Sequence, residues 1–321
     1  MQYNLKDFTE IIEGGLAGIE YTDNAPRLFA PVRYTLEGGG KRLRPCLVLA
    51  TYAALSGREP AEALNQALAV EVFHNFTLLH DDVMDNAAVR RGRPTAHLKW
   101  NANAAILSGD AMLTLATQLL AKCPADRLAA LLDMFNRTAM EIYEGQQLDM
   151  EFETRSDVTV GEYIKMIALK TSVLLGCACA LGAIMAEASE ADVKAMYEYG
   201  YGMGLSFQLR DDWLDTFGDP EVFGKKIGGD ILNRKKTWLL ITAMAESEGE
   251  LADILREDLE DEELISQVRR VYTRLKVGDR CNDLAKRYAA EAASHLKTVA
   301  MPQAASDFFL SLAEKSYTRT H

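Results

Sequence analysis

Residues 61–85, AEALNQALAVEVFHNFTLLHDDVMD, contain the pattern that decides the fold. Apolar side chains recur there at steps of three and four residues, which places them on one face of a long helix. They are Leu64, Leu68, Val72, Phe76, Leu79 and Val83. The same helix then carries three aspartates, Asp81, Asp82 and Asp85. A helix that is apolar over several turns and then presents three carboxylates indicates the mouth of a cavity.

The same helical periodicity governs most of the chain. It predicts helices over residues 105–122, 127–153, 163–188, 191–215 and 231–245, with shorter ones starting near residues 264, 277 and 303. Alternating β-branched strands are absent, no internal repeat is visible, and no linker is long enough to separate domains. We therefore predict one all-α domain over residues 1–321, built from about ten or more packed helices.

Composition excludes several classes of function. The 321 residues are 48% hydrophobic and carry a net charge of -12, which argues against nucleic acid as a partner because phosphate backbones need clustered positive charge. The five cysteines form no CxxC pair and sit in apolar stretches, which predicts free thiols in a reducing compartment. The polar N-terminal segment is no signal peptide, and we find no apolar run of about 18 residues. These features predict a cytoplasmic protein without a membrane span.

The first aspartate cluster has the spacing of a magnesium site. Asp81 and Asp85 are four residues apart and share one helix face, where two carboxylates repel unless a cation lies between them. Mg²⁺ prefers oxygen ligands and is often held by one or two carboxylates plus substrate phosphates. The alternative is an exposed acidic helix end. Arg90 and Arg91 follow within ten residues, and guanidinium groups pair with phosphate oxygens, so together these residues favour a metal–diphosphate site.

A second cluster repeats the first. The segment SFQLRDDWLDTFGD carries Asp211, Asp212 and Asp215, again with the first and last aspartate four apart. Two aspartate-tipped helices facing each other would clamp Mg²⁺ around one diphosphate. Downstream, the segment GKKIGGDILNRKKT offers Lys225 and Lys235 as point charges for phosphate.

These motifs, in this order, resemble those of the trans-isoprenyl diphosphate synthases, the family that includes farnesyl, geranylgeranyl and longer polyprenyl diphosphate synthases. The resemblance extends from GGGKRLRP at residues 38–45 to LAEKSYTR near residue 319. It implies an all-α bundle around a deep central cavity, a homodimer, and a cluster of about three Mg²⁺ ions for which Mn²⁺ can substitute. The motif KKTWLL departs slightly, because Trp238 and Leu239 stand where Leu-Pro is common.

The resemblance also implies a role for individual residues. Isopentenyl diphosphate would be bound by Lys41, Arg44, His74 and Arg91. The allylic diphosphate would be bound by Arg90, Lys170, Thr171, Gln208, Lys225 and Lys235. The direct metal ligands would be Asp81, Asp85 and Asp211. Asp82, Asp149 and Asp215 would contact the metal through water. Asp149 belongs to the GQQLD motif, which also contains Gln146. The residues that act on the leaving group would be Asp81, Asp85, Arg90, Lys170, Asp211 and Lys225.

The implied reaction is the ionisation of an allylic diphosphate, followed by attack of isopentenyl diphosphate on the allylic cation. The aromatic Phe76 and the small Thr77, just over one helical turn before Asp81, predict a short product, with geranylgeranyl (C20) favoured over farnesyl (C15) diphosphate. Phe73 is a second candidate barrier. Three alternatives stay open at this point: a class I terpene cyclase, a longer-chain polyprenyl synthase, and plain core packing for Phe76. A non-catalytic subunit is disfavoured because both aspartate motifs are intact.

Overall fold

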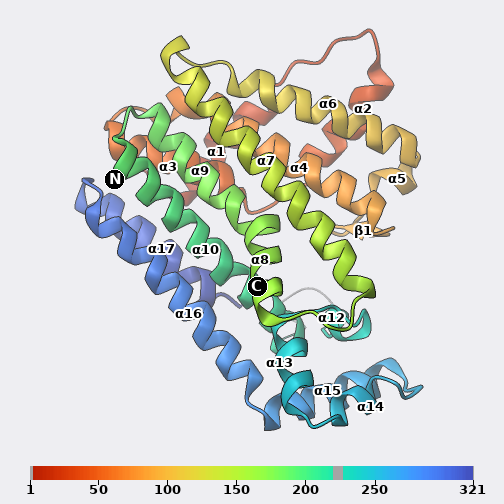
Figure 1. Ribbon diagram of the computed structural model, residues 1–321. Coiled ribbons are helices and arrows are strands. Elements are labelled where there is room, and N and C mark those ends of the chain that lie inside the picture. The colour runs from red at the N-terminus through yellow and green to blue at the C-terminus, as the bar shows by residue number, and fades with distance from the viewer. Residues whose placement is uncertain (1–2, 220–226, 321) are drawn as a thin grey trace. The chain divides into compact units, whose positions relative to one another are not determined.

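The computed structural model of the chain describes residues 3–219 and 227–320 (Figure 1). Its first half contains α1 (Leu5–Ala17), α2 (Pro26–Leu36), α3 (Leu43–Ser56), η1 (Pro60–Ala63), α4 (Leu64–Met84), the strands β1 (Val89–Arg90) and β2 (Arg93–Pro94), α5 (Ala96–Lys99), α6 (Ala102–Leu120) and α7 (Ala125–Thr154). Its second half contains α8 (Val160–Ile167), η2 (Ala168–Ser172), α9 (Val173–Met185), α10 (Glu190–Phe217), α12 (Gly229–Leu232), α13 (Trp238–Glu246), α14 (Glu250–Ile254), α15 (Asp261–Arg274), α16 (Val277–His295), η3 (Leu296–Thr298) and α17 (Gln303–Thr318). The predicted all-α class is confirmed.

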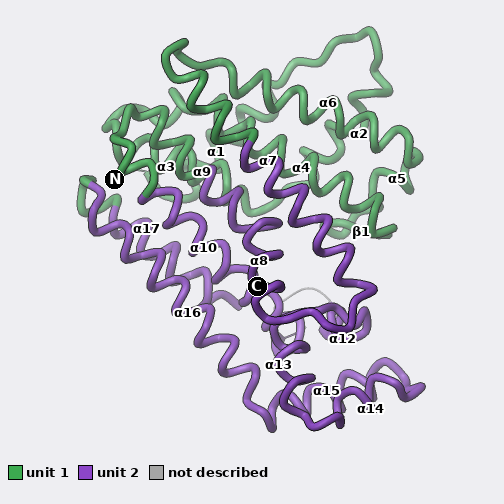
Figure 2. Tube along the Cα trace, in the orientation of Figure 1, with its two compact units in different colours: residues 1–136, 178–194, 300–305 green, residues 137–177, 195–299, 306–321 purple. Residues whose placement is uncertain are grey.

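The chain divides into two compact units (Figure 2). Unit 1 comprises residues 1–136, 178–194 and 300–305. Unit 2 comprises residues 137–177, 195–299 and 306–321. The first aspartate cluster therefore belongs to unit 1 and the second to unit 2.

Unit 1 is organised around α4. This helix packs along α6 and also contacts α1 and α3. The middle of the predicted apolar face, from Leu68 to Leu79, is buried, whereas Leu64 and Val83 at its two ends are half-buried. Phe73, outside that face, is 0% exposed and lies among the largest fully buried residues of the protein. Glu71 and Asn75 are among the polar residues that are buried on the same helix. Because buried polar groups need partners, they point to a functional interior beside α4.

Unit 2 has its own apolar core. Leu205 and Leu209 of α10 pack there with Tyr163 of α8 and Val268 of α15. The helices α13, α15 and α16 pack against one another around this core. Burial of these apolar faces fixes the direction of α10 and hence the position of the aspartates at its end.

Several sequence-based expectations need correction. The single helix predicted over residues 231–245 is two helices, α12 and α13. The chain breaks because Arg234 adopts a left-handed φ of 51° and because Thr237 caps α13 by accepting a hydrogen bond from the Leu240 amide. The helices α1, α2 and α3 were not predicted by the periodicity. A short antiparallel ribbon, β1–β2, stands where no strand was expected.

One stretch bears on membrane spanning. The continuous helical segment Val160–Met185 is long and apolar enough to cross a bilayer by length and composition, although no such run was expected. However, 78% of its most apolar window is buried inside the protein, as in the core helix of a soluble protein. Length and composition alone are therefore weak evidence for a membrane span here.

Candidate active site

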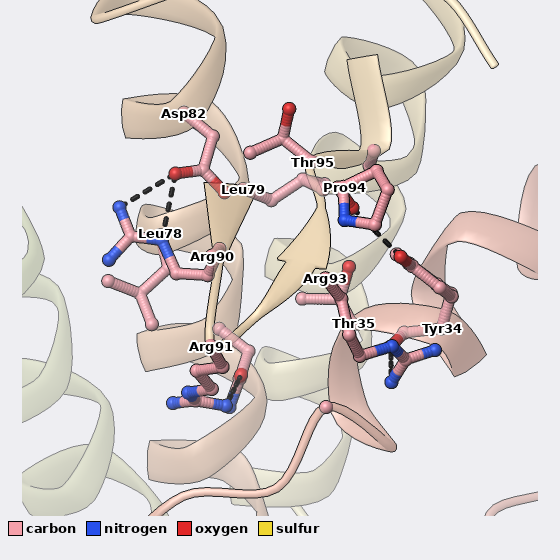
Figure 3. A pocket seen from close by; sticks show the side chains of 13 residues that line it. Tyr34, Thr35, Leu78, Leu79, Asp82, Arg90, Arg91, Arg93, Pro94 and Thr95 are labelled. Atoms are coloured by element: carbon pink, nitrogen blue, oxygen red, sulfur yellow. Dashed lines mark hydrogen bonds and ion pairs between the residues drawn. The ribbon is translucent and has the colours of Figure 1, made fainter. Parts of the chain in front are cut away.

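The first aspartate cluster is joined to the arginines by a tight hairpin. Strands β1 and β2 are connected by Arg91 and Gly92, whose φ angles of 51° and 73° are both positive, as a two-residue type I′ turn requires. The hairpin brings Arg90 to Asp82: Nε and Nη2 of Arg90 lie 2.8 and 2.7 Å from Oδ1 of Asp82 (Figure 3). Asp82 is 5% exposed, so its carboxylate fixes the orientation of Arg90 from inside the protein.

The three aspartates of this cluster do not face the same way. Asp85 caps the end of α4 and donates its amide to the Asp81 carbonyl at 2.8 Å. Asp81 is half-buried and Asp85 is exposed, whereas Asp82 is buried. This follows from the helix period, since the next residue along a helix turns away from the face that the first and fifth share. Asp81 and Asp85 are thus the outward pair that the sequence predicts as metal ligands.

Arg91 lies against the glycine-rich loop. Its Nη1 donates to the Gly39 carbonyl and approaches Oδ1 of Asn75 at 3.4 Å. Gly40 has a φ of 136°, a conformation that side-chain-bearing residues rarely adopt, so the loop needs glycine there. Arg91 and Asn75 border a small cavity of about 40 Å³ that is also lined by Asp82, Arg90 and Arg93 (Figure 3).

Arg42 anchors the loop from inside. It is 3% exposed and donates to Glu71 of α4 at 2.5 Å, to Glu13 of α1 at 2.7 Å and to the Leu36 carbonyl at 2.7 Å. Asn75 donates to the same Glu71 carboxylate at 2.8 Å. The network places the neighbouring Lys41, which is exposed, and Arg44, which is half-buried. The sequence-based reasoning missed it, although a glutamate and an asparagine inside an apolar helix face were its signal.

His74 and Arg44 lie together in unit 1. Nη1 of Arg44 is 3.3 Å from Nε2 of His74. A guanidinium can only donate, so Nε2 accepts and the ring proton resides on Nδ1. Burial, followed by the charges of Arg44, Arg91, Arg90 and Arg42, lowers the pKa of His74 well below its usual value. His74 is therefore neutral at neutral pH and contributes a hydrogen bond rather than a charge.

In unit 2, a π-helical turn presents the Lys-Thr pair. Residues Ala168–Ser172 form this turn, η2, and π-turns within α-helices are frequent at functional sites. Gly145 of α7 lets the two helices approach closely, because a Cβ there would lie 2.4 Å from the Lys170 amide nitrogen. Lys170 can then reach Asp149 of α7, with Nζ 2.5 Å from Oδ2.

A hydrogen-bonded chain leads from this turn to the second aspartate cluster. Thr171 donates to Gln208 at 3.3 Å, and Gln208 donates to Oδ1 of Asp212 at 3.0 Å. The phenol of Tyr163 donates to the other oxygen of Asp212. Asp212 is 2% exposed, so the second aspartate of this motif also faces the interior, like Asp82 in unit 1. Tyr163 is a residue that the sequence-based reasoning missed.

Unit 2 concentrates negative charge next to this network. Burial, together with the charge of Asp230, raises the pKa of Asp212, and burial raises the pKa of Asp230 as well. Burial alone would lower the pKa of Lys235, but Asp230, Asp212 and other nearby carboxylates outweigh it and raise that pKa. Asp215 accepts a hydrogen bond from the Asp230 amide at 2.9 Å, which ties α10 to α12. Lys225 lies outside the described residues.

These residues fit a magnesium site by their chemistry. Over residues 3–219 and 227–320, no three Asp, Glu, His or Cys side chains converge closely enough to hold an ion by themselves. Mg²⁺ is usually held by one or two carboxylates together with water and substrate phosphates, and Asp81, Asp85 and Asp211 offer carboxylate oxygens of this kind. Burial raises the pKa values of Asp212 and Asp230, and the charges of nearby carboxylates raise them further, so a cation in this region would favour their ionised forms. The donor set therefore suits a metal that arrives with a diphosphate.

Comparisons with known proteins agree with this chemistry. The family model described as polyprenyl synthetase matches residues 25–274. The chain is 43% identical over 218 residues to a geranylgeranyl diphosphate synthase of Methanosarcina mazei, a match that covers 67% of each chain. It is 36% identical over 261 residues to a geranylfarnesyl diphosphate synthase of Natronomonas pharaonis, covering 76% of each. A crystal structure of a geranylgeranyl pyrophosphate synthase matches with a TM-score of 0.95 and 39% identity over 100% of both chains.

Proposed function

The chain belongs to the polyprenyl synthetase family, whose enzymes are trans-prenyltransferases, and we propose that it condenses isopentenyl diphosphate with an allylic diphosphate and releases diphosphate. The observation that carries the proposal is the same arrangement in both units. In each, a helix ends in an aspartate pair, the middle aspartate is buried in a hydrogen-bonded network, and a cation lies close by. The family match includes residues of both units, which supports the proposal of one synthase domain.

The metal assignment follows from the outward carboxylates. We propose that Asp81, Asp85 and Asp211 hold about three Mg²⁺ ions with the allylic diphosphate, and that Mn²⁺ can replace Mg²⁺. Bound Mg²⁺ would stabilise the negative charge that develops on the leaving diphosphate. Asp149 and Asp215 would act through water. Asp82 forms an ion pair with Arg90, so its proposed role is to orient the Arg90 guanidinium for binding a phosphate oxygen.

Each diphosphate has its own set of side chains in the proposal. Arg90, Lys170, Thr171, Gln208, Lys225 and Lys235 would bind the allylic diphosphate. Lys41, Arg44, His74 and Arg91 would bind isopentenyl diphosphate. Support for the second set comes from the buried anchor of Arg42 on Glu71, which holds the glycine-rich loop beside Arg91 and His74. Fixed donors of this kind position the double bond of the second substrate for attack.

A class I terpene cyclase is the alternative that uses similar carboxylates. A co-substrate assay separates the two activities. The purified protein is incubated with Mg²⁺ and geranyl or farnesyl diphosphate, with and without labelled isopentenyl diphosphate. Incorporation of the label into a longer diphosphate supports the synthase. Release of a cyclic hydrocarbon in the absence of isopentenyl diphosphate would overturn the proposal.

The division of the site makes a kinetic prediction. His74→Ala removes a neutral hydrogen-bonding group beside Arg44, so the KM for isopentenyl diphosphate should rise about tenfold or more, with a smaller change for the allylic substrate. Lys170→Ala should show the reverse pattern because it removes a charge from the allylic side. Initial rates measured with each substrate varied in turn check this. Equal changes of both KM values in both variants would contradict the division.

We also propose that the protein is a cytoplasmic homodimer. Large apolar side chains are exposed on α6, where Leu107 is 59% exposed, and on α7, where Met140 is 59% exposed. A second copy would bury such groups. Light scattering at micromolar protein concentration should give twice the mass of 35.6 kDa. A monomer under these conditions would contradict the assembly and leave the reaction untouched.

A further inference from the structure

The aspartate predicted as the direct metal ligand of unit 2 already has a cationic partner. Arg319, just after α17, donates from Nη2 to Oδ1 of Asp211 and, at 3.1 Å, to the Phe207 carbonyl. Its guanidinium carbon lies 3.6 Å from the centre of the Phe207 ring. The Arg319 side chain is 12% exposed and the Asp211 side chain 36%, so the pair is sheltered from water on one side. These contacts hold a positive charge where a metal ion would bind.

The backbone of Arg319 is anchored independently of its side chain. Arg210 donates from Nε and Nη2 to the Arg319 carbonyl, at 3.0 and 2.9 Å. Arg210 itself is fixed by Asn282 at 3.1 Å and by the Trp213 ring, whose centre lies 4.1 Å from the guanidinium carbon. The anchor would therefore survive any change of the Arg319 side chain.

The side-chain contact is weaker than an arginine–carboxylate pair can be. One nitrogen, Nη2, serves both the carboxylate and the Phe207 carbonyl, whereas the strongest pairs use two parallel N–H donors. The Nε of Arg319 is buried without a hydrogen-bond partner among the described residues. A guanidinium held in this way neutralises Asp211 and is still displaceable.

We propose that Arg319 is a placeholder cation, which occupies Asp211 in the substrate-free protein and must be displaced before Mg²⁺ binds there. This inference rests on the proposed function, because it takes Asp211 as a metal ligand. While Oδ1 of Asp211 is paired with the Arg319 guanidinium, the negative charge of the carboxylate is largely neutralised, so it attracts Mg²⁺ less strongly. Arg319 therefore weakens metal binding in the absence of substrate, and the diphosphate that arrives with Mg²⁺ provides an anion for the released guanidinium. Arg319 acts through Asp211 and is a positioning residue.

Metal affinity in the absence of substrate tests the inference. Mn²⁺ binding is followed by electron paramagnetic resonance, in a background with Asp81→Asn and Asp85→Asn so that the first cluster does not contribute. Arg319→Gln keeps the anchored carbonyl and removes the charge. We expect its dissociation constant for Mn²⁺ to fall by roughly three- to tenfold. Arg319→Lys retains a charge and should stay close to the parent.

A matched control removes another arginine–carboxylate pair from unit 2. Arg274 pairs with Glu250 at the surface, away from the aspartate cluster, so Arg274→Gln should leave Mn²⁺ affinity unchanged. Unchanged or weaker binding in Arg319→Gln would overturn the placeholder role, since a merely structural arginine would lower affinity when lost. Tighter binding in Arg274→Gln as well would also overturn it, because general charge would then be the cause.

A further variant separates this inference from the proposed function. In the same background, Asp211→Asn should abolish most of the remaining Mn²⁺ binding. If Asp211→Asn binds Mn²⁺ like the parent, Asp211 is no ligand, and both the metal assignment and the placeholder role fail. If Asp211→Asn loses binding while Arg319→Gln shows no gain, the placeholder role alone fails. Thermal unfolding gives a second readout: Mg²⁺ should raise the Tm of Arg319→Gln more than that of the parent, by mass action on the folded state.

Discussion

Asp211→Ala is expected to lower kcat by roughly a thousandfold or more while the protein stays folded, because it removes a carboxylate that we propose holds metal at the leaving diphosphate. Asp211 lies on the outward face of α10 at 36% side-chain exposure, so its loss opens no cavity in the core. Asp81→Ala, at the corresponding place on α4 in unit 1, should give a fall of the same order. Steady-state turnover at saturating Mg²⁺ and circular dichroism measure the two parts of this expectation.

The control for charge is Asp258→Ala. Asp258 is an exposed acidic residue in the segment between α14 and α15, so its removal changes the net charge equally without touching either cluster. Its turnover should match that of the unchanged protein. Turnover within a few-fold of normal in Asp211→Ala or Asp81→Ala would contradict the metal assignment. A loss of helical signal would mean that the variant reports on folding, and Asp211→Asn would then replace it.

The sequence predicts the parts of this protein that depend on local periodicity. The buried face of α4 follows from apolar residues at steps of three and four, and the outward position of Asp81 and Asp85 follows from their spacing of four. The same rule fails where the chain turns by backbone conformation. Arg234 has a left-handed φ, which an arginine in the sequence does not indicate, so the break between α12 and α13 could not be predicted.

Long-range partners are the second class of feature that the sequence conceals. Arg319 meets Asp211 although 108 positions separate them, and Tyr163 meets Asp212 across 49 positions. These pairs form because α8 and the segment after α17 pack beside α10. Packing of this kind depends on the folded unit, so it cannot be read from the local sequence. The π-turn at Lys170 is similar: its irregularity is tolerated because Gly145 leaves room for it. The candidate site residues could be named from the sequence, but the residues that hold them in place could not.

In each aspartate cluster the middle aspartate is buried, whereas the first one is more exposed. Asp82 and Asp212 are buried at 5% and 2% exposure, and each accepts hydrogen bonds from fixed donors. Burial of a carboxylate without partners would be costly, so these networks stabilise the helix ends that present Asp81 and Asp211. The histidine beside the first cluster, His80, also helps to hold the end of α4 in place, through contacts with α6. His80 lies 3.0 Å from the Ile106 carbonyl and packs over Gly109, where a Cβ would lie 2.1 Å from its ring.

We expect product length to depend on the residues that lie below the first cluster, and Phe76 is the residue expected to set it. Positions four and five before Asp81 lie about 6–7.5 Å deeper along α4 at a rise of 1.5 Å per residue. Phe76 is 5% exposed, and its ring centre lies 5.5 Å from that of Phe73 and 4.8 Å from that of His80. Rings on both sides prevent Phe76 from swinging aside. Thr77 is small and satisfies its hydroxyl by donating to the His74 carbonyl at 2.8 Å, so it leaves space beside the ring.

Phe76→Ala should therefore extend the main product beyond the proposed C20 length, and Thr77→Phe should shorten it towards C15. Phe135→Leu is the matched control, because Phe135 is a buried ring of the same cluster, 5.0 Å from the Phe73 ring, that is not expected to form the floor. Chromatography and mass spectrometry of the dephosphorylated products give the chain lengths. If Phe76 is only core packing, Phe76→Ala would lose roughly 3–5 kcal/mol of stability with an unchanged product. If Phe135→Leu also gave longer products, the cause would be a loosened core and not the loss of the Phe76 ring. A main product of C30 or longer from the unchanged protein would show that Phe76 does not limit product length, and it would leave the condensation reaction intact.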